Sequence, residues 1–205
     1  MDFKLYLITD RRLFSDDNEL FAAVEEALEG GVKAVQLREK DLETRSLLRM
    51  AYSLRELTSG YGAKLFINDR VDIALAVDAD GVHLGGESMP AFAARKAAGE
   101  ALLIGVSAHS IGEAKEAEEE GADFVTLGPI FETPSKIKYG HPLGPGLLSE
   151  VSGKISIPVF AVGGIKKERV GSVLESGAAG IALISAILGS EDIRLNTEEF
   201  MRLLK

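Results

Sequence analysis

The 205-residue sequence predicts an α/β protein that folds as one (β/α)₈ TIM barrel over residues 1–205. Eight short apolar segments alternate with longer segments of helical periodicity, and eight is the strand count of such a barrel. Polar residues follow several apolar segments, at the strand ends where these barrels carry their chemistry. A doubly wound open sheet would share the alternation. No Gly-x-Gly-x-x-Gly turn follows the first strand, however, and this favours the barrel.

The predicted strands share a high content of Val, Ile, Leu and Phe. In chain order they are Leu5–Thr9, Ala34–Leu37, Leu65–Asn68, Gly81–Leu84, Leu102–Val106, Phe124–Gly128, Val159–Val162 and Gly180–Ile184. The segments between them have apolar residues at helical spacing. These predicted helices are Asn18–Leu28, Thr44–Leu57, Val71–Val77, Ala91–Ala98, Glu113–Glu120, Glu168–Ser176 and Glu198–Leu204.

Local signals predict where some helices begin and end. Ser110 with Glu113, and Asn196 with Glu199, have the spacing of capping boxes, so each pair is expected to start a helix. Helices often end at a glycine because this residue tolerates the left-handed backbone conformation. Three glycines follow helical stretches and are expected to end them: Gly31, Gly121 and Gly177.

Composition excludes several function classes. The hydrophobic fraction of 46% and charged fraction of 27% are typical of a soluble globular protein. The net charge of -9 disfavours nucleic acid and anionic membrane as partners, so small molecules are expected. The sequence has no Cys, which excludes disulfides and thiolate chemistry and agrees with a cytoplasmic location. No apolar run approaches a membrane span or a signal peptide. The oligomeric state stays open, a homo-oligomer included.

Gln36, Arg38 and Lys40 alternate along the chain at the end of the second predicted strand. An extended backbone would point all three side chains to one side, into the barrel mouth. Two cations and an amide suit a pyrophosphate group. The alternative is a solvated charged stretch in which Glu39 and Asp41 pair with the cations. Because an apolar run leads directly into the segment, we favour the binding site.

Asn68 and Asp69 end the third predicted strand. A carboxylate at the barrel mouth is a typical Mg²⁺ ligand when the substrate brings phosphate oxygens. Alternatively, Asp69 caps the helix that follows at Val71. The sequence leaves both interpretations open.

A long segment rich in Pro and Gly, Pro129–Gly146, interrupts the strand–helix rhythm and carries Lys138 and His141. A loop of this length is usually a lid or a binding loop, although a passive surface loop is the alternative. Hydroxyl donors and a cation suited to anions lie within it at Thr133, Ser135 and Lys136.

The seventh and eighth strands are followed by Gly163-Gly164 and by Ser185. Barrels commonly bind a phosphate at this place through backbone amides and the amino end of a short helix. A tight turn that requires glycine is the alternative.

Three histidines are possible acid/base groups. His83 lies inside a strand and is expected to be a buried, hydrogen-bonded imidazole. His109 follows the fifth strand beside Ser107 and is the better acid/base candidate, while His141 stays undecided. No spacing indicates a transition-metal site or a Ser/His/Asp triad.

Five segments, taken in order, resemble the thiamine phosphate synthase family and its close relatives, the TenI-type thiazole tautomerases. The resemblance runs from Leu5 to Ile187, and its segments are Val35–Lys40, Ile67–Asp69, Gly81–Gly85, Gly128–Lys136 and Val162–Ile165. It implies a transferase that joins 4-amino-2-methyl-5-hydroxymethylpyrimidine diphosphate to a thiazole phosphate. The products are thiamine phosphate and pyrophosphate, and the implied cofactor is Mg²⁺.

The resemblance also implies roles for matching residues. The pyrimidine contact is Gln36 and the Mg²⁺ ligand is Asp69, while the thiazole phosphate site contains Gly164 and Ser185. Arg38, Lys40 and Lys136 would be catalytic by stabilising the charge of the departing pyrophosphate. Further contacts to the pyrophosphate come from Asn68 and Ser107, and Thr133 and Ser135 match the hydroxyl positions of the loop.

One departure puts the metal site in question. The synthases usually carry Gln-x-Asp, whose aspartate is a second magnesium ligand, where this chain has Gly86-Glu87-Ser88. Three interpretations stay open: Glu87 replaces that ligand, metal binding is weaker, or the protein has other chemistry. In the simplest interpretation of Ser88, this residue caps the next helix. A TenI-type tautomerase is one alternative, but its catalytic histidine is Pro129 here. A non-catalytic thiazole-phosphate-binding regulatory protein is another, although it would not need a pyrophosphate cradle.

Overall fold

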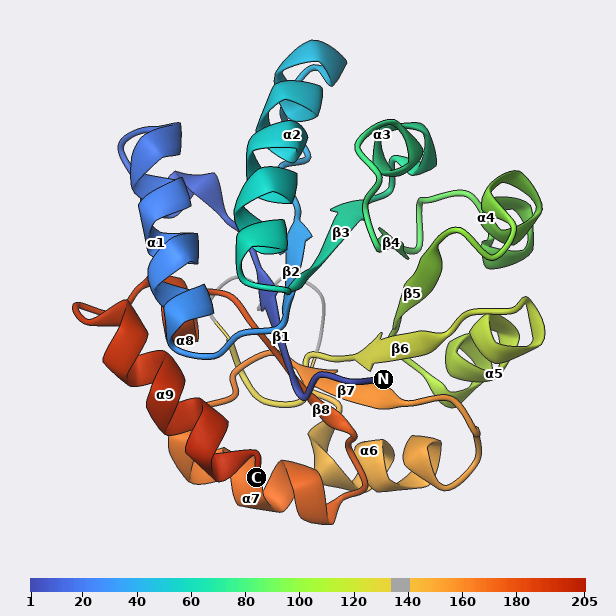
Figure 1. Cartoon of the computed structure of the whole chain (residues 1–205). Coiled ribbons are helices and arrows are strands. Elements are labelled where there is room, and N and C mark those ends of the chain that lie inside the picture. Colours follow the sequence, from blue (N-terminus) through green and yellow to red (C-terminus); the bar gives the residue numbers. More distant parts are fainter. Residues whose placement is uncertain (134–140) are drawn as a thin grey trace.

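Eight parallel strands close into a barrel in the computed structural model, which describes residues 1–133 and 141–205. Each strand pairs with its neighbour in the sequence, and β1 pairs with β8 to complete the ring (Figure 1). The strands are β1 Leu5–Ile8, β2 Ala34–Leu37, β3 Lys64–Asn68, β4 Gly81–Leu84, β5 Leu103–Ala108, β6 Phe124–Leu127, β7 Val159–Val162 and β8 Gly180–Leu183. The predicted (β/α)₈ barrel is confirmed, and each strand lies within two residues of its predicted bounds.

Helices form the outer ring around this barrel (Figure 1). They are α1 Asp17–Glu29, α2 Thr44–Gly60, α3 Val71–Ala76, α4 Ala91–Ala98, α5 Ile111–Glu119, α6 Gly144–Ser152, α7 Lys167–Glu175, α8 Ser185–Leu188 and α9 Ile193–Leu203, with a short 3₁₀ helix η1 at Arg11–Leu13. None of the helices in the described part of the chain is long and apolar enough to cross a membrane.

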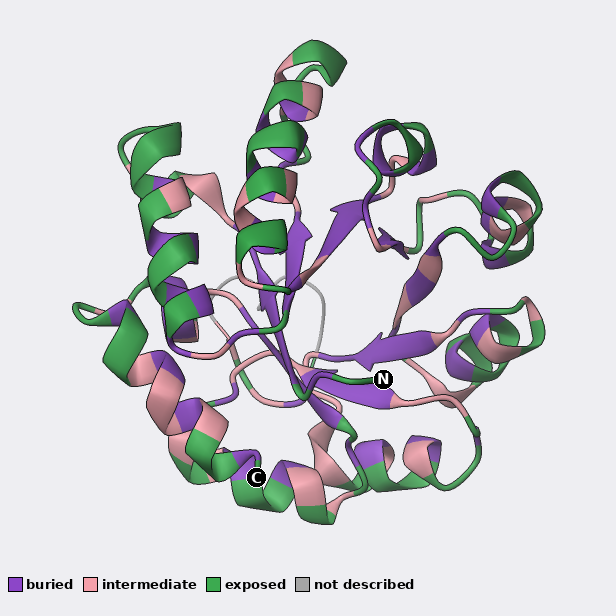
Figure 2. Cartoon of the chain, viewed as in Figure 1, coloured by how far each residue is buried: buried purple, intermediate pink, exposed green. Residues whose placement is uncertain are grey.

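Aromatic rings fill the inside of the barrel, while a larger aliphatic layer lies between strands and helices. The interior cluster includes Phe3, Tyr6, Phe66, Phe124 and Phe160. Phe66 and Phe124 meet edge to face with ring centroids 5.6 Å apart, a favourable aromatic geometry. Figure 2 shows the buried strands inside a ring of helices whose outer faces are exposed.

Glycines on neighbouring strands make room for these rings. A Cβ atom at Gly105 would lie 2.4 Å from the Phe124 ring, and one at Gly81 would lie 2.4 Å from the Phe66 ring. Both distances are far below van der Waals contact, so these positions require glycine. The inside of the barrel is therefore a packed core.

Two helix signals have opposite outcomes. Ser110 caps α5 as predicted, because its hydroxyl accepts from the Glu113 amide at 3.2 Å. The capping box at Asn196 and Glu199 is wrong: α9 starts at Ile193, and its cap is Asp192. The Asn196 amide instead donates to the Ala186 carbonyl at 2.6 Å. The expected left-handed glycines are confirmed, with φ values of 107°, 89° and 89° at Gly31, Gly121 and Gly177.

The prediction of a continuous loop over Pro129–Gly146 is wrong at the carboxyl end of this segment. Helix α6 already begins at Gly144, with a proline in its first turn. Proline is well placed there because the first helical amides need no partner within the helix. Helix α8, directly after β8, was not predicted either.

Candidate active site at the barrel mouth

The polar residues predicted at strand ends come together at the carboxyl ends of β2, β3 and β5. Arg38 and Lys40 follow β2, Asn68 and Asp69 end β3, and Ser107 lies in β5. The Lys40 Nζ atom is 3.8 Å from Oδ2 of Asp69, which joins two of the sequence motifs directly. Parallel strands that end at one rim explain this convergence.

Gln36 forms part of the floor of the mouth, where only 1% of its surface is exposed. Its Nε2 atom donates to the Tyr6 hydroxyl at 3.0 Å. Its Oε1 atom is buried and has no hydrogen-bond partner within residues 1–133 and 141–205. A buried amide oxygen without a partner is costly, and a donor group on a bound ligand would satisfy it.

A chain of buried polar groups continues from Gln36 beneath the mouth. The Tyr6 hydroxyl lies 3.5 Å from Nδ1 of His83, and Nε2 of His83 lies 3.0 Å from the Ser107 hydroxyl. Thr126 Oγ1 also approaches His83 Nε2, at 3.3 Å. The expectation that His83 is a buried, hydrogen-bonded imidazole is confirmed.

Burial keeps the His83 ring neutral. Desolvation, together with the charge of Arg38, lowers the pKa of His83 to about 3, although the charge of Asp69 acts in the opposite direction. A neutral imidazole has one donor and one acceptor nitrogen. Because Gln36 already donates to the Tyr6 oxygen, Tyr6 can donate to Nδ1 of His83, whose Nε2 then donates to Ser107. The Ser107 proton is left to donate to a ligand.

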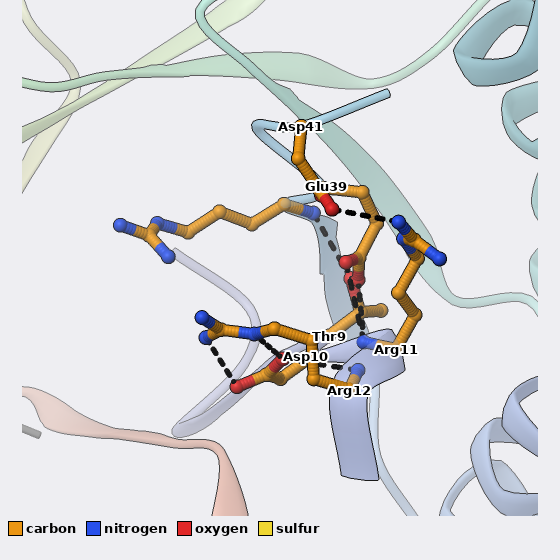
Figure 3. Close-up of polar contacts among 7 residues, drawn as sticks. Thr9, Asp10, Arg11, Arg12, Glu39 and Asp41 are labelled. Atoms are coloured by element: carbon orange, nitrogen blue, oxygen red, sulfur yellow. Dashed lines mark hydrogen bonds and ion pairs between the residues drawn. The ribbon is translucent and has the colours of Figure 1, made fainter. Parts of the chain in front are cut away.

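Glu39 and Asp41 face away from the mouth, toward the loop after β1 (Figure 3). Glu39 accepts from the Thr9 hydroxyl at 2.6 Å, and Asp41 pairs with Arg11 at 2.6 Å. The alternative in which these carboxylates pair with Arg38 and Lys40 is therefore wrong. The Arg38 guanidinium makes no hydrogen bond or ion pair to any residue within 1–133 or 141–205. The Arg38 guanidinium thus remains available to an anionic ligand.

Asp69 is held in an unusual conformation at the mouth. Its φ is 62°, a left-handed value that is uncommon outside glycine and is found often at functional sites. Asn68 Nδ2 donates to its Oδ2 at 2.7 Å, and Ser88 donates to its Oδ1. Helix α3 begins after Arg70 without a side-chain cap, so the interpretation of Asp69 as a helix cap is wrong.

Ser88 is also not a helix cap. Pro90 precedes α4, and no side-chain cap bond is made there. The Ser88 hydroxyl instead accepts from the Gly85 amide at 2.6 Å while it donates to Asp69. Glu87 is exposed, and the hydrogen bonds to the Asp69 carboxylate come from Asn68, Ser88 and the Gly85 amide instead. Within the described residues, no group of three or more His, Asp and Glu side chains could hold a metal ion.

The turn after β7 has a structural need for glycine. Gly163 and Gly164 have φ values of 94° and 65°, and a Cβ atom at Gly164 would lie 2.5 Å from the Glu132 carbonyl oxygen. The tight-turn interpretation is therefore sufficient for the two glycines, and their phosphate contact stays a prediction. Ser185 is exposed at the first position of α8, beside the same rim.

Arg169 on α7 supports this turn and was not predicted. Its guanidinium donates to the Gly164 carbonyl at 2.7 Å and stacks over the Phe131 ring at 4.5 Å from the centroid. This joins the loops that follow β6 and β7. The helical periodicity of α7 placed Arg169 on a helix, but the contact depends on the turn folding back over it.

The remaining predicted residues lie on the loop after β6 or beside it. Thr133 is half-buried at the last described position before the gap, while Ser135 and Lys136 lie outside the described residues, as does Lys138. The lid interpretation rests largely on that part of the chain and stays a prediction. His109 contacts the Gly128 carbonyl through Nδ1 at 2.5 Å, so that this nitrogen is a donor.

Comparisons with known proteins agree on one family. The family model described as thiamine monophosphate synthase matches residues 5–187. A putative thiamine-phosphate synthase of Geobacter sulfurreducens is 54% identical over 204 residues, covering 100% of this chain and 95% of the relative. The thiamine-phosphate synthase of Clostridium novyi is 48% identical, with 95% of each chain covered. A solved thiamine phosphate pyrophosphorylase from Pyrococcus furiosus superposes with a TM-score of 0.89 at 44% identity, covering 98% of this chain and 95% of that one.

Proposed function

The chain belongs to the thiamine monophosphate synthase family, and we infer from this membership that the mouth of its barrel is the place where thiamine phosphate is made. The activity is that of a transferase, in which a pyrimidine diphosphate is condensed with a thiazole phosphate. The observation that carries the assignment of the site is the arrangement around Arg38. Among the described residues its guanidinium has no hydrogen-bond or ion-pair partner, and the carboxylates of Glu39 and Asp41 are turned away from it.

In this proposal, the pyrophosphate group binds between the ends of β2, β3 and β5. Arg38 and Lys40 stabilise the negative charge that grows on the leaving pyrophosphate, and the Ser107 hydroxyl donates to its oxygens. Asn68 supports the site by holding the Asp69 carboxylate. Lys136, Ser135 and Thr133 would approach from the loop after β6, and Gly164 with Ser185 would bind the thiazole phosphate. No protein nucleophile is required, because the thiazole nitrogen captures the pyrimidine methylene group.

Gln36 fits the pyrimidine end of the substrate. Its buried Oε1 has no partner in the part of the chain that the structure describes, and it can accept a hydrogen bond from the amino group of the pyrimidine. The Gln36–Tyr6 hydrogen bond orients the amide so that this oxygen, and not the nitrogen, is available. The substrate is thereby placed with its reactive methylene group toward the cations.

The residues at Asp69 fit a bound Mg²⁺. The carboxylate lies at the rim with a third of its side chain exposed, and Lys40 is its neighbour. A single protein carboxylate is enough for Mg²⁺ when phosphate oxygens and waters complete its six ligands. When bound, the ion would neutralise charge on the pyrophosphate. Asp69 would hold it, and Ser88 and Asn68 would orient that carboxylate.

Two alternatives have less support. The tautomerase-type histidine is replaced by Pro129, and the relatives described above are synthases. A regulatory protein that binds only thiazole phosphate would not need the Arg38–Lys40–Asp69 arrangement. A cytoplasmic location remains part of the proposal and can be tested by cell fractionation.

The direct test is synthesis by the purified protein. We expect thiamine phosphate and pyrophosphate in equal amounts from the two substrates, with Mg²⁺ required. Arg38→Ala serves as the control for a contaminating synthase. Isomerisation of a thiazole carboxylate phosphate without any synthesis would instead assign the tautomerase activity. Binding of thiazole phosphate with neither reaction would support the regulatory role.

A further inference from the structure

A buried carboxylate lies between the two cations of the mouth and points away from them. Glu39 is only 5% exposed, although both of its chain neighbours, Arg38 and Lys40, reach solvent more freely. Removing a carboxylate from water is costly, and here burial raises the pKa of Glu39. A buried charge of this kind is retained only where hydrogen bonds compensate for its desolvation.

Glu39 joins the loop after β2 to the loop after β1 (Figure 3). Its Oε1 accepts from the Thr9 hydroxyl at 2.6 Å. The backbone amide of Arg11 donates to both carboxylate oxygens, at 3.1 and 3.2 Å. Two loops that are 30 residues apart in the sequence are thereby fixed to each other at the rim of the barrel.

The Thr9 hydroxyl also binds the backbone of Arg38. Strand β2 ends at Leu37, and the next amide, that of Arg38, donates to the Thr9 hydroxyl at 3.0 Å. A hydroxyl has one proton, and Thr9 gives it to Glu39 while its lone pair accepts from Arg38. The Thr9 oxygen is therefore the hydrogen-bond partner that fixes the backbone from which the Arg38 guanidinium projects.

We propose that Thr9 and Glu39 are positioning residues for pyrophosphate binding, because together they fix the backbone of Arg38 at the mouth. This proposal rests on the proposed function, which assigns the pyrophosphate to Arg38. Both side chains bind each other and backbone amides of the two loops, and no substrate contact is assigned to them. Their effect is exerted through the loop, because misplacement of a binding group by about 1 Å can lower a rate about a hundredfold.

The test compares three variants with the wild type. Thr9→Val removes the hydroxyl at nearly constant shape, and Thr9→Ser retains it. Thr197→Val is the matched control, because Thr197 is also fully buried and its hydroxyl donates to the Ile193 carbonyl at 2.7 Å in α9, on the outer ring. Calorimetric titration with magnesium pyrophosphate measures binding without turnover. Steady-state kinetics give kcat and KM, and urea unfolding confirms the fold.

We expect Thr9→Val to weaken pyrophosphate binding by about tenfold to a hundredfold, with Thr9→Ser close to the wild type. Thr197→Val should lose comparable stability but bind pyrophosphate normally. If Thr9→Val does not fold, Glu39→Gln replaces it, and at least a threefold weakening is expected because one acceptor oxygen is lost. Folded Thr9→Val or Glu39→Gln with wild-type affinity would overturn the proposal, as would equal losses in Thr9→Ser or Thr197→Val.

The result for the positioning role of Thr9 and Glu39 can be distinguished from the result for the proposed synthase activity. A wild type that binds magnesium pyrophosphate but makes no thiamine phosphate contradicts the synthase activity, and the comparison of variants still decides the role of Thr9. A wild type that does not bind pyrophosphate overturns the positioning role as well.

Discussion

Ser88 donates a hydrogen bond to Oδ1 of Asp69. The family resemblance implies a second acidic metal ligand at the position of Ser88. The hydroxyl therefore supports the carboxylate and adds no charge. Ser88→Asp should lower the Mg²⁺ concentration needed for half-maximal synthesis, because a second hard anionic ligand is added. Mn²⁺ binding followed by electron paramagnetic resonance gives the same comparison without turnover. Ser88→Ala is the control and should not lower the requirement; an unchanged requirement in Ser88→Asp would leave the proposed metal position without support.

Asp69→Asn should nearly abolish synthesis. Asparagine tolerates the left-handed backbone at this position, where φ is 62°, so the variant removes the charge without adding the strain that alanine would bring. The loss of turnover should persist at saturating substrate concentration, and excess Mg²⁺ should restore turnover only partly. Wild-type turnover in this variant would exclude Asp69 as the metal ligand.

Arg38→Ala should lower kcat by about a hundredfold or more and leave the fold intact, because a charge-stabilising group in an active site typically contributes this much. Lys40→Ala should cost less, about tenfold, since a flexible ammonium positions a phosphate less rigidly than a guanidinium. Thermal unfolding checks the fold of both variants. A folded Arg38→Ala protein with unchanged kcat/KM would remove Arg38 from the mechanism.

His83 should make the protein less stable as the pH falls. Its folded-state pKa is about 3, below the usual 6.5, so the unfolded chain takes up a proton first. This contribution is fully present above the unfolded pKa of 6.5 and is lost progressively down to pH 3. Between pH 7 and pH 5 the loss is about 2 kcal/mol.

Urea unfolding of the wild type and of His83→Gln at both pH values isolates this contribution, since other groups titrate in both proteins. The variant should show a smaller loss of unfolding free energy. Nitrogen NMR shifts should also report a neutral ring with the proton on Nε2 at pH 7. A proton on Nδ1 would reverse the direction of the hydrogen-bond chain from Gln36 to Ser107.

Arg169→Ala should raise the KM for thiazole phosphate several-fold with a smaller effect on kcat. The side chain holds the Gly164 carbonyl and stacks on Phe131, so its loss loosens the turn proposed to bind this phosphate. Arg169→Lys should not restore the KM, because an ammonium lacks the planar stacking surface. Arg202→Ala, at an exposed position of α9, is the matched control and should match the wild type.

The sequence predicted the barrel well because burial on both faces of each strand leaves continuous apolar runs, such as Val159–Val162. It also predicted that Lys40 and Asp69 would lie at the same rim, since parallel strands end there, and their side chains are 3.8 Å apart. The contact between Thr9 and Glu39 could not be predicted, because it depends on how two loops pack. Helix α6 was missed because its Gly-Pro-Gly start has low helix propensity.

Tyr6 belongs both to the aromatic cluster inside the barrel and to the hydrogen-bond chain beneath the mouth. Its ring packs against Phe66 and Phe124 with centroids 5.2 and 5.6 Å away, while its hydroxyl accepts from Gln36. A change in the size of either phenylalanine would tilt the ring and move the amide that the substrate meets. Attempts to engineer a wider pyrimidine pocket from below should therefore alter substrate selectivity and thermal stability together, and successful variants are expected to carry paired substitutions at the aromatic residue and its facing glycine.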